Sequence, residues 1–89
     1  MNARQIFLLE FLLKQHEYLS ANQLAEKYGV STKTVYQDID KLNDFFDEGE
    51  LKSRIDKVPR KGIKLSADEE RKKIHSLLLV NKHESGVQD

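Results

Sequence analysis

The stretch that decides the fold is SANQLAEKYGVSTKTVYQDIDKL, residues Ser20–Leu42 of this 89-residue chain. Ser20 followed by Gln23 is a capping-box pattern, in which two side chains satisfy main-chain N–H groups at a helix start. Gly29 is the residue type that ends a helix in the left-handed conformation without a steric penalty from Cβ. Ser31 is a second helix-capping residue. The stretch therefore predicts two short helices joined by a turn that contains glycine.

The two predicted helices cover Ala21–Tyr28 and Thr32 to about Phe46. Because the connection between them is so short, the helices must cross at a steep angle, and Ala25 is small where they approach most closely. This is the geometry of a helix-turn-helix, in which the first helix braces the second and the second projects into the major groove of DNA.

Spacing of apolar residues predicts the elements on either side. Residues 3–15 repeat apolar side chains at helical spacing, which predicts a first helix. After Gly49, apolar and charged residues alternate over 51–56 and again over 63–65, on either side of the turn sequence Val58–Gly62. We expect a two-stranded hairpin with a basic tip, and such a hairpin must pack on the helices to be stable.

The C-terminal part is predicted to form one more helix. Ser66 and Glu69 make another capping-box pattern, which predicts a helix directly after Ser66. The chain from Asn81 is polar, and we expect a frayed end or a link to a further domain. The predicted fold class is mainly α with a small antiparallel β-hairpin, a winged helix-turn-helix of three helices, a wing and a C-terminal helix. Residues 1–65 are the expected DNA-binding domain and residues 66–89 a helix or linker toward a regulatory domain outside this chain.

Charge is balanced overall but segregated along the chain. The sequence has 15 Lys or Arg residues and 15 Asp or Glu residues. Acidic residues dominate from Asp38 to Glu50, and basic residues dominate from Lys52 to Lys64. The folded domain can therefore present one positive face to phosphate, although a DNA-binding domain is usually basic overall.

Composition excludes several function classes. The chain has no cysteine, so it forms no disulfide and no thiolate metal site. It is too short for a catalytic domain beside the helix-turn-helix, and it shows no glycine-rich phosphate loop, nucleophile motif or metal-ligand cluster. No segment reads as a signal peptide or is long enough to span a bilayer. We expect a cytoplasmic, non-enzymatic domain without cofactor, metal, small-molecule ligand or membrane contact.

Three stretches resemble bacterial winged-helix regulators. Their recognition helix resembles VSTKTVYQDIDKLN from Val30, their wing resembles VPRKGIKL from Val58, and their first two helices resemble RQIFLLEFLLKQHEYLSANQLAEKYGVS from Arg4. The chain is most similar to the N-terminal DNA-binding domains of sugar-operon regulators that carry phosphotransferase-system regulation domains. The resemblance implies sequence-specific binding of double-stranded DNA in a transcriptional regulator of a carbohydrate operon. Many such relatives have Arg at the position of Gln37, so this chain lacks one charge of the family pattern.

The outward face of the second central helix supplies the candidate base-reading residues. At helical spacing this face carries Lys33, Tyr36, Gln37 and Asp40. Lys33 could pair with guanine O6 and N7, and Gln37 could pair with adenine. Thr32 or Thr34 could reach a phosphate or a thymine methyl group. The alternative is an ordinary solvated helix face.

The hairpin tip supplies the candidate backbone contacts. Arg60 and Lys61 could contact phosphate or the minor groove, or they could simply make the strand edge soluble. The complete set of candidate DNA-binding residues is Ser31, Thr32, Lys33, Thr34, Tyr36, Gln37, Lys41, Arg60 and Lys61.

Two acidic residues on the same helix are expected to stay away from phosphate. Asp38 could orient a nearby Arg or Lys, but a carboxylate only accepts hydrogen bonds, so we favour a structural role with a side chain of the first helix or a helix end. Asp40 would repel phosphate, and we expect it to turn away from the DNA backbone or to pair in the neighbourhood of Lys41.

Other function classes remain open at the level of sequence. A winged helix can be a protein-interaction module, which the neutral charge favours, or the repressor domain of a bifunctional protein of the biotin-ligase kind. RNA antitermination, a label that relatives sometimes carry, requires a different domain. A homodimer is also open, because such regulators commonly bind two half-sites.

Overall fold

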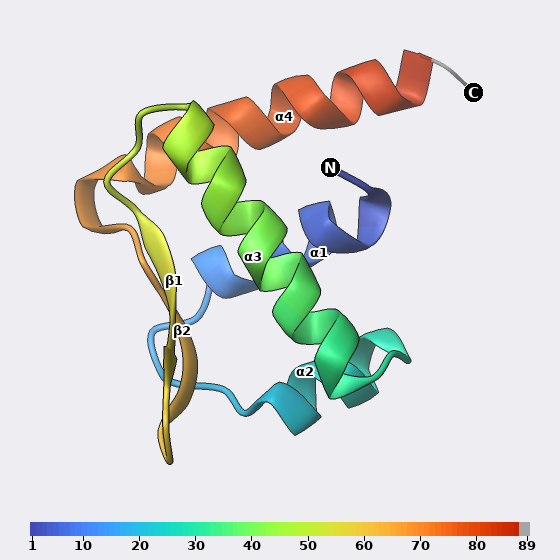
Figure 1. Cartoon of the computed structure of the whole chain (residues 1–89). Coiled ribbons are helices and arrows are strands. Elements are labelled where there is room, and N and C mark those ends of the chain that lie inside the picture. Colours follow the sequence, from blue (N-terminus) through green and yellow to red (C-terminus); the bar gives the residue numbers. More distant parts are fainter. Residues whose placement is uncertain (88–89) are drawn as a thin grey trace.

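The computed structural model describes residues 1–87 and contains four α-helices and one hairpin within that range (Figure 1). In chain order the elements are α1 (Ala3–Leu13), α2 (Ala21–Tyr28), α3 (Thr32–Glu48), β1 (Arg54–Val58), β2 (Gly62–Ser66), the short 3-10 helix η1 (Asp68–Glu70) and α4 (Arg71–Val87). This order and the antiparallel β1–β2 pair confirm the predicted winged helix-turn-helix.

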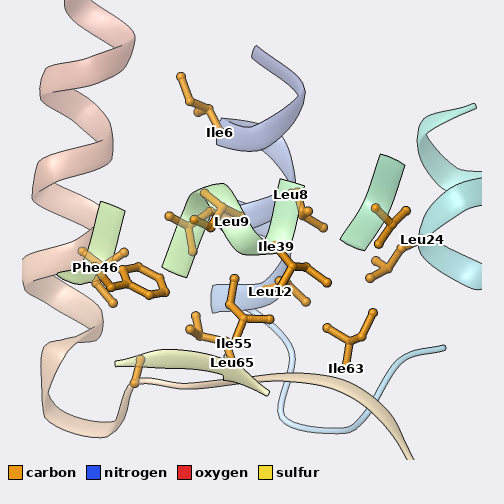
Figure 2. Packing of buried hydrophobic residues seen from close by; sticks show 14 of the residues in the cluster. Ile6, Leu8, Leu9, Leu12, Leu24, Ile39, Phe46, Ile55, Ile63 and Leu65 are labelled. Carbon is orange, nitrogen blue, oxygen red and sulfur yellow. The ribbon is translucent and has the colours of Figure 1, made fainter. Parts of the chain in front are cut away.

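All of these elements except η1 contribute buried side chains to one hydrophobic core. Figure 2 shows Leu9 and Leu12 of α1, Ile39 of α3, and Ile55 and Leu65 of the hairpin gathered in this interior. Leu24 and Ala25 bring α2 into the core, while Ile74 and Leu78 bring in α4. Because all four helices and the hairpin contribute side chains to this core, apolar packing fixes the orientation of α3 relative to the hairpin.

The predicted signals around α2 and α3 are confirmed. The Ser20 hydroxyl accepts from the Gln23 main-chain N–H at 3.0 Å, and the Gln23 side chain accepts from the Ser20 N–H at 2.8 Å. Gly29 ends α2 with φ +64°, the left-handed conformation expected of it. Ser31 caps α3 by accepting from the Thr34 N–H at 3.1 Å.

Two helix ends differ from the prediction. The first helix ends at Leu13, two residues before the expected Gln15. The second central helix continues to Glu48, beyond the expected Phe46. Gly49 follows α3 as predicted but keeps a negative φ, and Glu50 takes the left-handed conformation with φ +56°.

The hairpin pairs Ile55 with Leu65 and Val58 with Gly62, and its inward-facing Ile55, Ile63 and Leu65 are buried as the alternation predicts. The loop between α1 and α2 adds a third chain segment, because Leu19 exchanges two main-chain hydrogen bonds with Ile63 (2.9 and 2.7 Å). This bridge ties the hairpin to the start of α2.

The predicted capping box at Ser66 is wrong. The Ser66 hydroxyl donates to Asp56 Oδ2 at 2.8 Å, across the hairpin, and Ala67 precedes η1 without a side-chain cap. Glu70, one position after the Glu69 of the predicted capping box, accepts hydrogen bonds from the main-chain N–H groups of Lys52 and Ser53 (3.0 and 2.7 Å). Long-range partners therefore displace the local cap. The last helix starts at Arg71 and runs to Val87, so it continues past Asn81, where a frayed end or a link was expected. Residues 88–89, the end of the predicted 66–89 segment, lie outside the described residues.

Candidate nucleic-acid interface

The outward face of α3 lies as the helical spacing predicts. Lys33, Tyr36, Gln37 and Lys41 are exposed, while Thr32 and Thr34 are half-buried at the start of the helix. Tyr36 is 42% exposed, a large fraction for an aromatic side chain. This face is therefore accessible to a partner from the start of α3 through its third turn.

Ser31 and Thr34 belong to the helix cap as well as to the predicted site. Their two hydroxyl groups lie 3.1 Å apart and share one hydrogen bond. Each hydroxyl carries one proton, so the pair keeps one proton that can be donated to an outside acceptor such as a phosphate oxygen. The cap thus also places a donor at the N-terminal end of α3, where the helix dipole favours an anion.

Asp38 has the structural role that we favoured. Its carboxylate is 3% exposed and accepts from Arg4 Nε at 2.6 Å, from a second Arg4 nitrogen at 3.0 Å and from Gln5 Nε2 at 3.1 Å. Burial alone would raise the pKa of Asp38, but the hydrogen bonds from Arg4 and Gln5 and the charge of Arg4 outweigh it and hold the pKa below its usual value. The interaction fastens α3 to the start of α1.

Three side chains of α3 fasten this helix to β1. Asp40 Oδ1 pairs with Lys57 Nζ at 3.1 Å, and Asp47 Oδ1 pairs with Arg54 at 3.2 Å. Between them, Asn43 hydrogen-bonds the main chain of Ile55. These three positions recur along one side of α3, so the wing strand and the helix are held in a fixed register.

Asp40 pairs with a residue that the sequence analysis did not name. Its side chain is 67% exposed, and its ion-pair partner is Lys57 of the wing and not a residue near Lys41, while the alternative that Asp40 turns away from the DNA backbone stays a prediction. Lys57 Nζ also lies 5.8 Å from the centroid of the Tyr36 ring. The sequence analysis missed Lys57, because a partner 17 residues away leaves no local signal.

Three of the predicted residues of α3 line two depressions, one toward α1 and one toward the wing. Gln37 and Lys41 line the depression toward α1, together with Arg4. Tyr36 lines the depression toward the wing, together with Lys57 and Gly62. Lys33, the other candidate base-reading residue besides Gln37, lines neither of these two depressions.

The wing tip carries the two predicted basic residues. Arg60 and Lys61 are exposed in the turn that the Lys61 N–H closes on the Val58 carbonyl at 3.1 Å. Figure 1 shows the start of α3 and the tip of the hairpin at the same end of the molecule, the lower end in this view, with α4 at the opposite end. One straight surface can meet both.

The ion pairs of the described residues involve none of the basic side chains predicted to contact DNA. Within the described residues, ion pairs join Asp38 to Arg4, Asp40 to Lys57 and Asp47 to Arg54. Three carboxylates of the acidic segment are thus neutralised by basic partners inside the domain. No ion pair of the described residues engages Lys33, Arg60 or Lys61, so their charges are available at the lower end of the molecule.

The described residues hold no cluster of His, Asp or Glu arranged for a metal ion. None of the helices in the described range is long and apolar enough to cross a membrane.

A family model described as an HTH domain matches residues 4–64, which is more than half of the chain. Comparisons with curated proteins and with solved structures find no match.

Proposed function

The chain belongs to the HTH domain family, and from that premise we propose that it is the sequence-specific, double-stranded-DNA-binding domain of a bacterial transcriptional regulator. The observation that carries the proposal is the placement of the exposed face of α3 and the basic wing tip at one end of the molecule (Figure 1). In this proposal, α3 enters the major groove and the wing contacts the adjacent backbone.

The exposed side chains of α3 have the chemistry to read bases. Lys33 donates to guanine O6 and N7, and Gln37 pairs with adenine N6 and N7. Thr32 is close enough to the helix start to contact a phosphate or a thymine methyl group. Lys41, one turn beyond Gln37, is proposed to contact a phosphate.

Backbone contacts are proposed for both ends of the interface. The Ser31–Thr34 hydroxyl pair supplies one donor at the start of α3, and Arg60 and Lys61 supply two charges at the wing tip. Tyr36 stands between them and stacks its exposed ring against the sugar-phosphate surface. Phosphate contacts set the register of the domain on the duplex, while the base contacts provide specificity.

The resemblance of the chain to sugar-operon regulators supports carbohydrate-operon control as the biological role, exercised in the cytoplasm by a non-enzymatic protein. Residues 1–65 would carry the DNA-binding function and residues 66–89 would connect it to a sensory part. Ile74 and Leu78 are buried in the core, so the first half of α4 is also part of the folded unit. A homodimer on two half-sites is proposed for the complete regulator.

Selection of binding sites from a random duplex library tests the proposal. We expect enrichment of a defined sequence, and tighter binding to the selected duplex than to a scrambled duplex of the same composition. Affinity for both duplexes should fall as salt rises. Absence of any duplex binding would contradict the proposal and favour the protein-interaction alternative.

A further inference from the structure

A second cluster of positive charge lies on the flank of the wing. Tyr18 is exposed, and two lysines approach its ring, with Lys64 Nζ at 5.5 Å and Lys61 Nζ at 5.9 Å from the ring centroid. The three residues come from two segments, the loop before α2 and the wing. We call them the Tyr18 cluster.

The main chain fixes the position of this cluster. Leu19 and Ile63 exchange two hydrogen bonds, which places their neighbours Tyr18 and Lys64 side by side across the bridge. Lys64 alternates with the buried Ile63 and Leu65 along β2, so its side chain lies on the solvent face of the hairpin. Paired backbone therefore positions Tyr18 and Lys64, while Lys61 reaches the ring from the turn at the wing tip.

Neither lysine of the cluster is in an ion pair of the described residues, although Asp56 lies opposite Lys64 in the strand pairing. Among the described residues, the basic side chains in ion pairs are Arg4, Arg54 and Lys57, and the Asp56 carboxylate accepts from the Ser66 hydroxyl at 2.8 Å. The aromatic ring orients both ammonium groups by cation–π attraction, and the Tyr18 hydroxyl adds a neutral donor. Two cations and one hydroxyl donor around a single ring are the chemistry that recognises a phosphate group.

We propose that the Tyr18 cluster binds a phosphate of duplex DNA outside the sequence that α3 reads. The inference rests on the proposed function. Strand β1 of the wing contacts α3, because Lys57 pairs with Asp40 and lies near the Tyr36 ring. The cluster lies on the solvent face of the hairpin, and Lys61 is shared between it and the wing tip. The basic surface thus extends from the tip along the solvent face of β2, and in this proposal it lengthens the footprint at the wing end.

The test uses the full chain and the selected duplex with its flanks shortened from one end at a time. Lys64→Gln removes one charge of the cluster, and Lys52→Gln is the matched control, since Lys52 is an exposed lysine at the far end of the hairpin. With both flanks present, we expect Lys64→Gln to flatten the slope of log affinity against log salt by about 0.9, the value of one phosphate contact. Lys52→Gln should leave the slope unchanged. Shortening one particular flank should abolish the difference between Lys64→Gln and the wild type.

The tyrosine is tested by two substitutions. Tyr18→Phe keeps the ring and should keep the salt slope, with a small loss of affinity from the missing hydroxyl. Tyr18→Ala should flatten the slope as Lys64→Gln does, because the lysines lose the surface that orients them. Equal slopes for Lys64→Gln, Lys52→Gln and the wild type would overturn the cluster while leaving the proposed function intact. A Lys64→Gln effect that persists on both shortened duplexes would overturn the flanking position. Failure of the wild type to bind any duplex would overturn both proposals.

Discussion

The side-chain amide of Asn43 makes two hydrogen bonds with the main chain of Ile55. Its Oδ1 accepts from the Ile55 N–H at 2.8 Å, and its Nδ2 donates to the Ile55 carbonyl at 3.2 Å. Asn43 is buried on α3 and Ile55 is buried on β1, so the bonds are shielded from water. They join the helix proposed to read bases to the wing proposed to hold the backbone.

Asn43→Leu is expected to destabilise the domain by about 1–3 kcal/mol, because it leaves the buried N–H and carbonyl of Ile55 without partners. Urea unfolding followed by circular dichroism measures the change. Asp44→Leu, at the exposed neighbouring position, is the control and should change stability far less. Equal effects of the two substitutions would show that the Asn43 bonds contribute little.

Glycine at position 62 is expected to be harder to replace than glycine at 29. Both have positive φ, +114° and +64°. A Cβ on Gly62 would lie 2.9 Å from the Leu19 carbonyl carbon and closer still to its oxygen, whereas a Cβ on Gly29 meets nothing within 4 Å. Gly29→Ala should cost about 1–2 kcal/mol from the left-handed conformation alone, and Gly62→Ala should cost more. Thermal unfolding of both variants measures the two losses of stability. A larger loss for Gly29→Ala than for Gly62→Ala would contradict the close approach of Gly62 to Leu19.

Stability should fall in acid partly through Asp38. The pKa of Asp38 is lowered in the folded state, so its contribution is complete well above the unfolded pKa of about 3.9 and is lost as pH falls through the lower folded pKa. Asp38→Asn removes this titration. At neutral pH the wild type should have the higher unfolding midpoint. The difference between the two midpoints should shrink as pH falls below ~4, because the wild-type carboxylate becomes protonated. A constant difference across this range would show that the pair with Arg4 does not lower the pKa.

Lys33→Ala is expected to weaken binding to the selected duplex by about 1–3 kcal/mol, the worth of one good base contact, and to leave the fold unchanged. Because Lys33 is exposed, the melting temperature is the control for folding. Fluorescence anisotropy on selected and scrambled duplexes measures the effect, and an equal loss on both would reassign Lys33 to a phosphate.

The double variant Arg60→Ala and Lys61→Ala should weaken selected and scrambled duplexes alike. Each neutralised phosphate contributes about −0.9 to the salt slope, so two lost contacts flatten it by roughly one to two units. Salt titrations on both duplexes provide the measurement. An unchanged slope would return these residues to the alternative of a solubilising strand edge.

Local signals were sufficient to predict most of the fold. The Ser20–Gln23 box, Gly29 and Ser31 act on groups within a few residues, and the structure confirms each of them. An equivalent signal at Asn2 and Gln5, which form the capping box of α1, was present in the sequence and was missed. The alternation around the hairpin predicted its buried residues because a strand's two faces follow directly from sequence parity.

Features that depend on distant segments could not be read from the sequence. Ser66 and Glu69 had the spacing of a capping box, yet the Ser66 hydroxyl donates to Asp56. Glu70 instead accepts from the Ser53 N–H in the segment before β1. The pairing of Asp40 with Lys57 and the meeting of Tyr18 with Lys64 likewise depend on how helix and hairpin pack. The candidate base contacts of α3 stay predictions, which the Lys33→Ala measurement tests.

The outer edge of β1 is occupied by side chains where a neighbouring strand would otherwise bind. The N–H of Ser53 is bonded to Glu70, and two residues further on, Ile55 is bonded on both its main-chain groups to Asn43. Open strand edges are templates for the aggregation of identical chains, and these two side chains occupy such an edge from inside the molecule. This part of the β1 edge is therefore closed to a strand from a second copy of the chain.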